Sequence, residues 1–451
     1  MKPAFFIILI LAITGEEYSI AFPQSAPCEF DSTIWAAIQH VSKDSIAVHI
    51  KNLSIANRYY SRTSYTPGNK WAARYIFDYF QKLPAIHQVV MDSFFVYGAK
   101  APYDTIPLVN IVATFQGKRD TNQYIIIGGH FDATANRDPN YNWDDDWSTA
   151  MAPGSDDNAT GVAAMLEIAR VLSQRFQKNP NNITLKLIAF GAEEKHPAYF
   201  NSNHLGSRRY AWKAFNRGDR ILCAFILDMI GYNQDTLHFS IVSDSASAAF
   251  GRRALEINHC YAINLHTDGA PFPEATYSDH ESFWLYGYRA ILIIENAPPW
   301  NDHPPWYSSN PHYHKQSDTP DKINMEQVAR IAQLTLGTAL SLEKAVTAFS
   351  ASESNMMLPQ IPKLLPNAPN PFNNGTWIRF ALPRAAELQI EIFDIHGRVI
   401  QRLYHAKASA GYHSVYWNGT DRFNHAVSSG VYLYRLIGQD FILTRKMILI
   451  R

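Results

Sequence analysis

Two adjacent carboxylates and an amide stand in the turn-forming segment 152–161, which reads APGSDDNATG. The residues after it, VAAMLEIARVL, have the apolar spacing of an amphipathic helix. One Asp or Asn is enough to cap a helix, because its side chain accepts hydrogen bonds from the unpaired backbone N–H groups at the N-terminus. The segment therefore predicts either a helix cap alone or a cap beside a carboxylate that is held for a cation.

Acids and histidines also follow several apolar runs that have the character of strands. They stand after YIIIGG, ITLKLIAFGA and ILCAFIL, or in the loop PHYHKQSDTPDK before the last predicted helix. Because ligands bind at the carboxyl ends of strands in an open α/β sheet, these side chains can converge on one edge together with the acids of 152–161. The residues concerned are His130, Asp132, Glu193, Glu194, Asp228, His314 and Asp318.

This set of side chains favours a catalytic metal site. Asp228 lies in the apolar run AFILDMIG, where a desolvated carboxylate needs a partner such as a cation. Imidazoles and carboxylates without a thiolate suit catalytic zinc, and one such ion takes three protein ligands. Five ligands suit two ions that lie roughly 3.5–4 Å apart and share a carboxylate. The predicted ligands are Asp157 as the bridge, His130 and Asp228 on one ion, and Glu194 and His314 on the other.

Three further acids have expected roles beside these ligands. Glu193 is the predicted general base, because neighbours in an extended segment point to opposite sides and the residue after it faces the metal. Asp132 is expected to orient the imidazole of His130. Asp318 is expected either to orient His314 in the same way or to cap the last helix.

The apolar runs also predict the fold that positions these residues. Near-continuous apolar strands that alternate with helices indicate an α/β fold, a mostly parallel mixed sheet flanked by helices. The predicted strands are 124–130, 183–194, 221–231 and 289–297, and the predicted helices beside the site are 160–176 and 323–346. Towards the C-terminus, short runs with period-two alternation and intervening turn residues indicate an all-β sandwich.

The chain accordingly divides into a leader and two folded units. Residues 1–21 have the short basic start, apolar stretch and small-residue end of a signal peptide. We expect a catalytic domain at 29–348, a Ser-, Pro- and Asn-rich linker at 349–365, and a β-sandwich at 366–451.

Charge and cysteine content narrow the class of protein further. Forty basic and forty acidic residues cancel, so the chain has no net positive field to attract nucleic acid. The three cysteines, Cys28, Cys223 and Cys260, allow at most one internal disulfide and leave one thiol over.

Taken in order, the motifs GGHFD, APGSDDNATG, GAEE, LDM, SDH and HKQSDT resemble the co-catalytic zinc aminopeptidase family known as M28. The resemblance extends over roughly residues 50–345 and implies a zinc exopeptidase-like fold that holds two zinc ions. It implies the same five metal ligands, and Glu193 as the base. One departure is the insertion KHPAYFNSNH at 195–204, before LGSRRYA, which leaves the substrate preference open.

The C-terminal unit has a resemblance of its own. The runs NAPNPFNNGTWIRFALP, IFDIHGRVI, GYHSVYWNGTD, SSGVYLYRL and TRKMILIR resemble the Ig-like sorting domain of exported bacterial proteins. This resemblance implies that the domain engages secretion machinery and that the protein is secreted or held at the cell surface.

The expected function is that of an exported, monomeric aminopeptidase acting on peptides with a free N-terminus. Phe272, Tyr277 and Phe283 are expected either to line the pocket for the substrate side chain or to pack in the core. Three alternatives stay open: a glutaminyl-cyclase-like enzyme with one zinc on the same fold, a carboxypeptidase on that fold, and a surface binding module without catalytic activity. Metal stoichiometry separates the cyclase, assays with amino-blocked peptides separate the carboxypeptidase, and peptide turnover separates the binding module.

Overall fold

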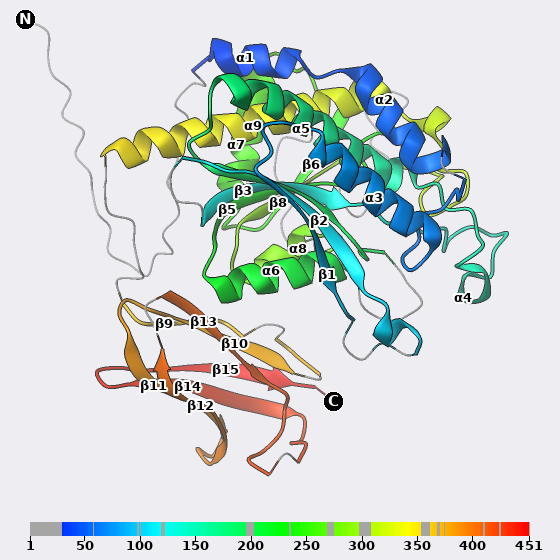
Figure 1. Ribbon diagram of the computed structural model, residues 1–451. Coiled ribbons are helices and arrows are strands. Elements are labelled where there is room, and N and C mark those ends of the chain that lie inside the picture. The colour runs from blue at the N-terminus through cyan, green and yellow to red at the C-terminus, as the bar shows by residue number, and fades with distance from the viewer. Residues whose placement is uncertain are drawn as a thin grey trace, which may run out of the picture.

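The structure is a computed structural model that describes residues 29–56, 58–96, 99, 101–118, 122–194, 203–233, 236–267, 275–296, 308–352, 361–367, 370–373, 375–408, 411–423 and 425–450. The predicted signal peptide 1–21, Phe272 and most of the insertion 195–204 lie outside these residues. Within the described ranges, no helix is long and apolar enough to cross a membrane. The elements form an α/β unit and a smaller β unit (Figure 1).

The α/β unit is built on an eight-stranded mixed sheet of order β1-β2-β4-β3-β5-β8-β6-β7, which confirms the predicted fold class. The central strands β4, β3, β5 and β8 run parallel. β2 pairs antiparallel with β1 and with β4, and β6 pairs antiparallel with β8 and parallel with the short edge strand β7. The strands are β1 (Gln88–Phe94), β2 (Leu108–Phe115), β3 (Gln123–His130), β4 (Thr184–Phe190), β5 (Arg220–Leu227), β6 (His238–Ser243), β7 (His266–Thr267) and β8 (Ala290–Ile294).

Helices cover both faces of this sheet (Figure 1). Alternate residues of β3 enter the two cores, with Ile125 and Ile127 in one and Ile126 in the other. Because β3 is buried on both faces, its sequence is a continuous apolar run. One face is covered by α1 (Ser32–Gln39), α2 (Lys43–Lys51), α3 (Pro67–Gln81), α5 (Gly161–Lys178), α7 (Ala248–Cys260) and α9 (Met325–Ser352), and the other by α6 (Leu205–Arg217) and α8 (His280–Trp284).

Shorter helical turns connect these elements, and one of them, η3, carries the predicted ligand Asp157. They are η1 (Asn52–Ala56), η2 (Tyr103–Thr105), α4 (Trp143–Asp146), η3 (Ser155–Thr160) and η4 (Pro320–Lys322). Two of the three cysteines lie in other elements, and Cys28 lies outside the described residues. Cys223 is a buried free thiol in β5, and Cys260, the last residue of α7, is disulfide-bonded.

The C-terminal unit consists of two antiparallel sheets of order β13-β10-β9 and β12-β11-β14-β15. Phe380, Trp417 and Tyr434 are buried between them. The strands are β9 (Lys363–Leu364), β10 (Thr376–Leu382), β11 (Ala386–Asp394), β12 (Val399–Ala408), β13 (Gly411–Trp417), β14 (Gly430–Gly438) and β15 (Ile442–Leu449). Since α9 extends to Ser352 and β9 starts at Lys363, a helix and a strand occupy the two ends of the predicted linker 349–365.

The β unit contacts the α/β unit through α6 and the end of α8. The Trp377 ring of β10 lies 6.3 Å from the Trp212 ring of α6, and the Tyr416 ring lies 5.0 Å from Trp377 on the other side. Arg379, which is 7% exposed, donates a hydrogen bond to the carbonyl of Leu285 directly after α8. The interface between the two units therefore combines aromatic packing with a buried hydrogen bond.

Candidate metal centre

The candidate site forms where β3, β4 and β5 end side by side. His130 is the last residue of β3 and pairs in register with Phe190, the last residue of β4. Glu193 and Glu194 follow β4 within four residues, and Asp228 directly follows β5. The parallel register therefore brings three separate chain segments to one edge, as the strand-end argument predicted.

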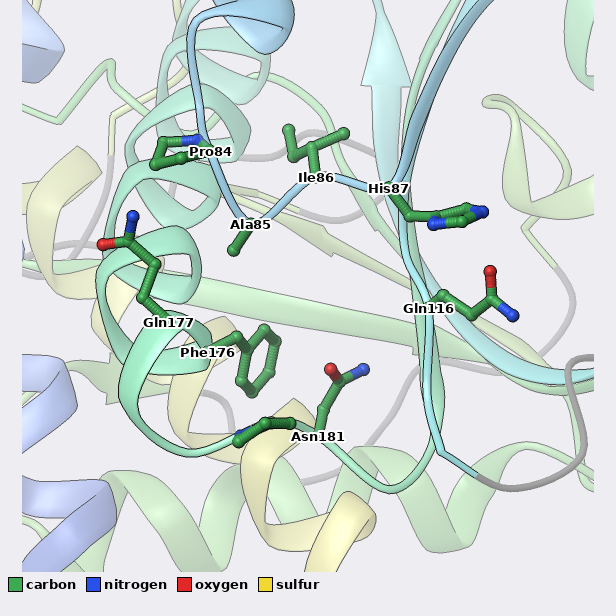
Figure 2. Close-up of a pocket in the computed structure, with 9 residues that line it drawn as sticks. Pro84, Ala85, Ile86, His87, Gln116, Phe176, Gln177 and Asn181 are labelled. Carbon is green, nitrogen blue, oxygen red and sulfur yellow. The ribbon is translucent and has the colours of Figure 1, made fainter.

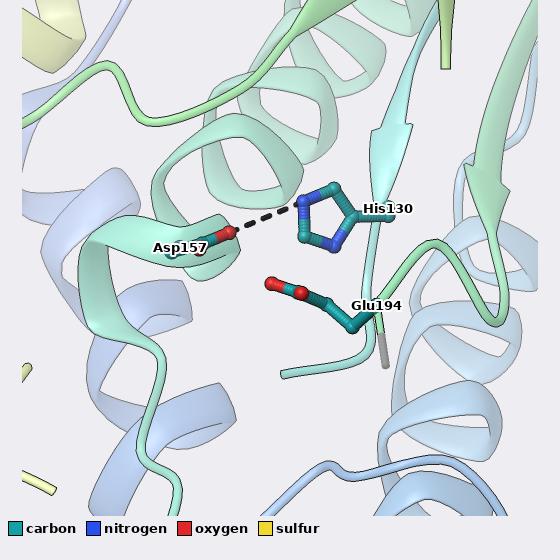
Figure 3. A group of neighbouring side chains, drawn as sticks. All are labelled: His130, Asp157 and Glu194. Carbon is teal, nitrogen blue, oxygen red and sulfur yellow. Dashed lines mark ion pairs between the residues drawn. The ribbon is translucent and has the colours of Figure 1, made fainter. Parts of the chain in front are cut away.

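Asp157 lies at the centre of this group, between two imidazoles. Its Oδ1 is 3.2 Å from His130 Nε2, and its Oδ2 is 3.0 Å from His314 Nε2. His130 Nε2 is also 3.2 Å from Asp228 Oδ1, and His314 Nε2 is 2.9 Å from Glu194 Oε1. Figure 3 shows His130, Asp157 and Glu194 pointing into a common space, where ligand atoms of these three lie within 4.8 Å of one another. All five side chains are at least nine-tenths buried.

The outer nitrogens of both imidazoles are occupied by oxygen acceptors. His130 Nδ1 lies 3.2 Å from the Asp132 carbonyl, and His314 Nδ1 lies 3.0 Å from Asn136 Oδ1. An Nδ1–H that donates to these oxygens leaves the Nε2 lone pair directed into the site, which is the arrangement of metal-ligating histidines. This geometry fits a metal centre.

The charges in the site also fit divalent cations. Burial opposes the positive charge of His314, but Glu194 and Asp157 outweigh it and raise the pKa of this imidazole to about 10. Burial likewise opposes the negative charge of Asp157, yet the contacts with His130 and His314 lower the pKa of its carboxyl group. Protonated imidazoles thus balance the buried carboxylates here. Cations would balance the same carboxylates and leave both imidazoles neutral for coordination.

In the segment APGSDDNATG, the neighbours of Asp157 each make separate structural hydrogen bonds. Asn158 caps α5, because its Oδ1 accepts a hydrogen bond from Gly161 N at 2.9 Å, while its Nδ2 donates to the Leu227 carbonyl at 2.7 Å. Asp156 accepts from Gly231 N at 2.8 Å and so binds the loop after β5. Asp157 is therefore the carboxylate that remains for the site.

Asp318 has neither of the two roles expected from the sequence. Its Oδ1 accepts a hydrogen bond from Asp156 N at 2.9 Å, and its Oδ2 accepts from Asp157 N at 3.1 Å. Asn136, not Asp318, contacts the imidazole of His314. The correction has a simple physical reason, since two successive N–H groups of the turn at 155–157 converge on one buried carboxylate.

Asp132 connects the end of β3 to the acid pair after β4. Its Oδ1 accepts from Glu193 N and its Oδ2 from Glu194 N, both at 3.1 Å. Ser64 Oγ donates to Oδ2 as well, at 3.2 Å. Burial opposes the charge, but contacts with His130 and with these N–H groups lower the pKa of the Asp132 carboxyl group. The carboxylate thus orients the glutamates, while the Asp132 carbonyl contacts His130.

A buried arginine supports the two loops that carry Asp132 and Asp157. The Arg62 guanidinium is 0% exposed and donates to four backbone carbonyls. Its acceptors are Phe131 at 2.8 Å, Leu53 at 2.9 Å, Pro153 at 2.5 Å and Gly154 at 2.8 Å. Burial lowers the pKa of this group to about 10, so it stays charged at neutral pH beside the acidic site.

The predicted pocket aromatics lie in different environments. Phe283 is fully buried and packs against Phe190 with ring centroids 6.0 Å apart, which is the core-packing alternative. Tyr277 is 60% exposed. Phe272 lies outside the described residues.

A hollow of about 490 Å³ lies far from these groups, at the opposite end of β4 (Figure 2). It is lined by Pro84, Ala85, Ile86, His87, Gln116, Phe176, Gln177, Pro180 and Asn181. The first four residues precede β1, Gln116 directly follows β2, Phe176 and Gln177 lie in the last turn of α5, and the last two precede β4. His130, Glu194 and Asp228 instead lie at the carboxyl ends of β3, β4 and β5. The hollow is therefore separate from the metal centre.

Two polar residues at the site were missed by the sequence reasoning. Asn136 lies in the loop after β3, and its contact with His314 depends on the path of that loop. His204 lies 2.9 Å from the Glu193 carboxylate, although it is eleven residues further along the chain. The available signal was its position directly before LGS, where the insertion rejoins the motif.

Both units of the chain match known protein families. Residues 110–339 match "Peptidase family M28" and residues 370–439 match "FlgD Ig-like domain". Leucine aminopeptidase 1 of Paracoccidioides brasiliensis is 26% identical over 344 residues, which cover 71% of this chain and 78% of the relative. The uncharacterized protein YfbL of Escherichia coli is 27% identical over 272 residues, which cover 54% of this chain and 76% of the relative.

Solved structures share the fold of the α/β unit. The LapA aminopeptidase of Legionella pneumophila gives a TM-score of 0.53 at 20% identity, covering 72% of this chain and 78% of its own. A glutaminyl cyclase of Porphyromonas gingivalis gives a TM-score of 0.53 at 18% identity, covering 67% of this chain and 99% of its own. At these sequence identities the structural matches show the fold alone, so the activity has to be inferred from the residues of the site.

Proposed function

Since this chain belongs to peptidase family M28, we propose that it is an aminopeptidase that removes N-terminal residues from peptides at a pair of zinc ions. The observation that carries the proposal is the position of Asp157, whose two carboxylate oxygens face different imidazoles. Each imidazole has one further carboxylate neighbour, Asp228 or Glu194. The five side chains therefore form two donor sets around one shared carboxylate, which suits a two-metal site. The leucine aminopeptidase relatives support the substrate class.

The five ligands would hold the metal ions, and Glu193 would move the proton. Bound zinc ions polarise the scissile carbonyl and make a water molecule acidic near neutral pH. Glu193 accepts the proton from the attacking water and donates it to the leaving nitrogen. The Glu193 backbone is fixed by Asp132, so its carboxylate is presented from a rigid support.

Substitution of the base gives a direct test of this mechanism. The Glu193→Gln variant keeps the shape of the side chain but accepts no proton, so kcat on amino-acid anilides is expected to fall by about 10²–10⁴-fold. Zinc content should stay at the wild-type value, because Glu193 is not a proposed ligand. Wild-type turnover by this variant would overturn the assignment of the base.

Metal counting distinguishes the aminopeptidase from a glutaminyl cyclase. We expect two zinc ions per chain, hydrolysis of peptides with a free N-terminus, and loss of hydrolysis after chelation. One zinc per chain together with cyclisation of N-terminal glutamine would favour the cyclase. A metal-loaded chain that turns over neither substrate would instead be a binding module.

We also propose that the protein is a monomer that is exported through the leader 1–21 and engages secretion machinery through its C-terminal unit. N-terminal sequencing of protein from culture medium or cell surface is expected to begin after residue 21. Protein that retains residues 1–21 and stays inside the cell would contradict export.

A further inference from the structure

The residue before α6 is held beside Glu193 by the backbone. His204 N donates to the Glu193 carbonyl at 3.0 Å, Leu205 N to Ala192 O at 2.8 Å, and Gly206 N to Gly191 O at 3.0 Å. A Cβ at Gly206 would come within 2.3 Å of the Gly191 carbonyl, so only glycine permits this approach. Residues 204–206 therefore run alongside the segment that carries the proposed base.

His204 has an unfavourable backbone conformation at this point. Its φ of 60° lies in the left-handed region, which is unfavourable for a non-glycine residue and persists where the surroundings enforce it. The side chain is also nearly fully buried, at 4% exposed. A strained and buried polar residue beside a catalytic carboxylate calls for a specific role.

The imidazole of His204 bridges two carboxylates. Its Nε2 lies 2.9 Å from Glu193 Oε1 as an ion pair, and its Nδ1 lies 3.0 Å from Oε2 of Glu281 in α8. Arg208 of α6 also approaches Glu281 Oε2, at 3.4 Å. Burial opposes the positive charge of the ring, but Glu193, Glu281 and the buried Asp279 raise the pKa of His204 to about 10.

The helices that carry this bridge are themselves joined. Ser207 Oγ in the first turn of α6 lies 2.8 Å from Ser282 Oγ in α8. Glu281 is therefore held in place relative to His204 by a second contact between the same two helices. The contact between His204 and Glu281 is therefore fixed, and the other contact of the imidazole is with the carboxylate of Glu193.

We propose that His204 is a positioning residue for Glu193, which holds the carboxylate of the general base away from the metal ions and directed at the attacking water. This inference rests on the proposed aminopeptidase function. Glu193 stands next to the proposed ligand Glu194, so without a competing positive partner its carboxylate would be drawn to the same cations. The imidazole, anchored by Glu281, supplies that partner.

Two conservative variants separate the inner contact from the outer one. In His204→Gln, the side-chain amide can take the place of Nε2 beside Glu193, whereas in His204→Asn it can take the place of Nδ1 and reach only Glu281. His204→Ala removes both contacts. The measurements are kcat and KM on an amino-acid anilide, zinc content, and melting temperature.

We expect His204→Ala and His204→Asn to lower kcat by roughly 10–100-fold, the scale of a misplaced catalytic group, with KM and zinc content near the wild-type values. His204→Gln is expected to recover kcat to at least about fivefold above His204→Asn. In a Glu193→Gln background, His204→Ala should cause little further loss, because both changes act on one proton transfer.

Wild-type kcat in all three variants, or recovery by Asn and not by Gln, would overturn the inference and leave the aminopeptidase function standing. A loss of kcat that follows a loss of zinc or a lower melting temperature in His204→Gln as well would show a merely structural role. Wild-type protein that holds zinc but hydrolyses no anilide would overturn the proposed function, and the inference with it.

Discussion

The Asp132→Asn variant tests how the centre is held together. Asp132 is 0% exposed and accepts hydrogen bonds from Glu193 N, Glu194 N and Ser64 Oγ. An asparagine at this position has one oxygen and one NH₂ group. Whichever way the amide turns, the NH₂ group faces a backbone N–H, so one buried donor loses its acceptor and a second donor is placed against it.

The magnitude follows from these contacts. A hydrogen bond to a charged group contributes about 1.5–3 kcal/mol and a buried unsatisfied donor costs about 1–3 kcal/mol, so we expect the free energy of unfolding to fall by about 3 kcal/mol. For a unit of this size that corresponds to a melting temperature lower by roughly 4–5 °C. Because Asp132 also supports His130 and the Glu193–Glu194 segment, zinc affinity should fall by about 10–100-fold.

Calorimetry of the chelated and the zinc-loaded protein measures the first effect, and competition with a metal-binding dye measures the second. Ser64→Ala is the matched control, since it removes one donor at 3.2 Å from the same carboxylate and keeps the charge and both backbone bonds. It should cost only about 1 kcal/mol and leave zinc affinity unchanged. An Asp132→Asn protein with the melting temperature and zinc affinity of the wild type would refute the reasoning.

Three further predictions concern stability away from the ligands. Burial lowers the pKa of His49 from 6.5 to about 4, so the unfolded chain binds a proton in a range where the folded chain does not; stability should fall by about 2 kcal/mol between pH 8 and pH 5, and melting curves of His49→Gln should show less of this loss. Arg62→Lys cannot reproduce the four carbonyl contacts and should lower the melting temperature by several degrees, measured by calorimetry. Trp377→Ala removes the ring that packs on Trp212, so the two units should melt as more clearly separate calorimetric transitions while circular dichroism of the native protein stays unchanged.

The central part of the fold could be predicted because its strands are buried on both faces. β3, β4, β5 and β8 are continuous apolar runs, and their order in the chain with intervening helices indicates a parallel sheet. The edge strand β1 could not be recognised in the same way, because its sequence QVVMDSF is largely half-exposed and mixed in polarity. Its place depends on antiparallel pairing with β2, which local sequence does not specify.

The gathering of His130, Glu194 and Asp228 at one edge could be predicted because strand ends fix where a residue lies. The residues that orient them could not, since Asn136, Asp318 and His204 act through loops whose paths depend on tertiary contacts. Asp318 illustrates the limit. Its type and position before the last helix suggested a cap or a histidine partner, but its acceptors are turned towards backbone N–H groups more than 160 residues earlier in the chain.

The two pairs of adjacent acids in this site, Asp156–Asp157 and Glu193–Glu194, are oriented by the same hydrogen-bond arrangement. Asp318 accepts hydrogen bonds from the successive N–H groups of Asp156 and Asp157, and Asp132 accepts from those of Glu193 and Glu194. When successive N–H groups converge on one anion, the two side chains must leave the backbone in different directions. Asp157 and Glu194 then face His314, while Asp156 binds Gly231 N and Glu193 faces His204.

This hydrogen-bond arrangement explains why two acids that are adjacent in the sequence need not both be metal ligands. A third, buried carboxyl group fixes the backbone of each pair through its two N–H groups, so the direction in which each side chain leaves the backbone does not depend on the metal being bound. The buried carboxyl group behind each pair accepts hydrogen bonds from the N–H groups and interacts electrostatically with the buried guanidinium of Arg62. The folded chain therefore sets the backbone positions of the proposed ligands Asp157 and Glu194 and of the proposed base Glu193.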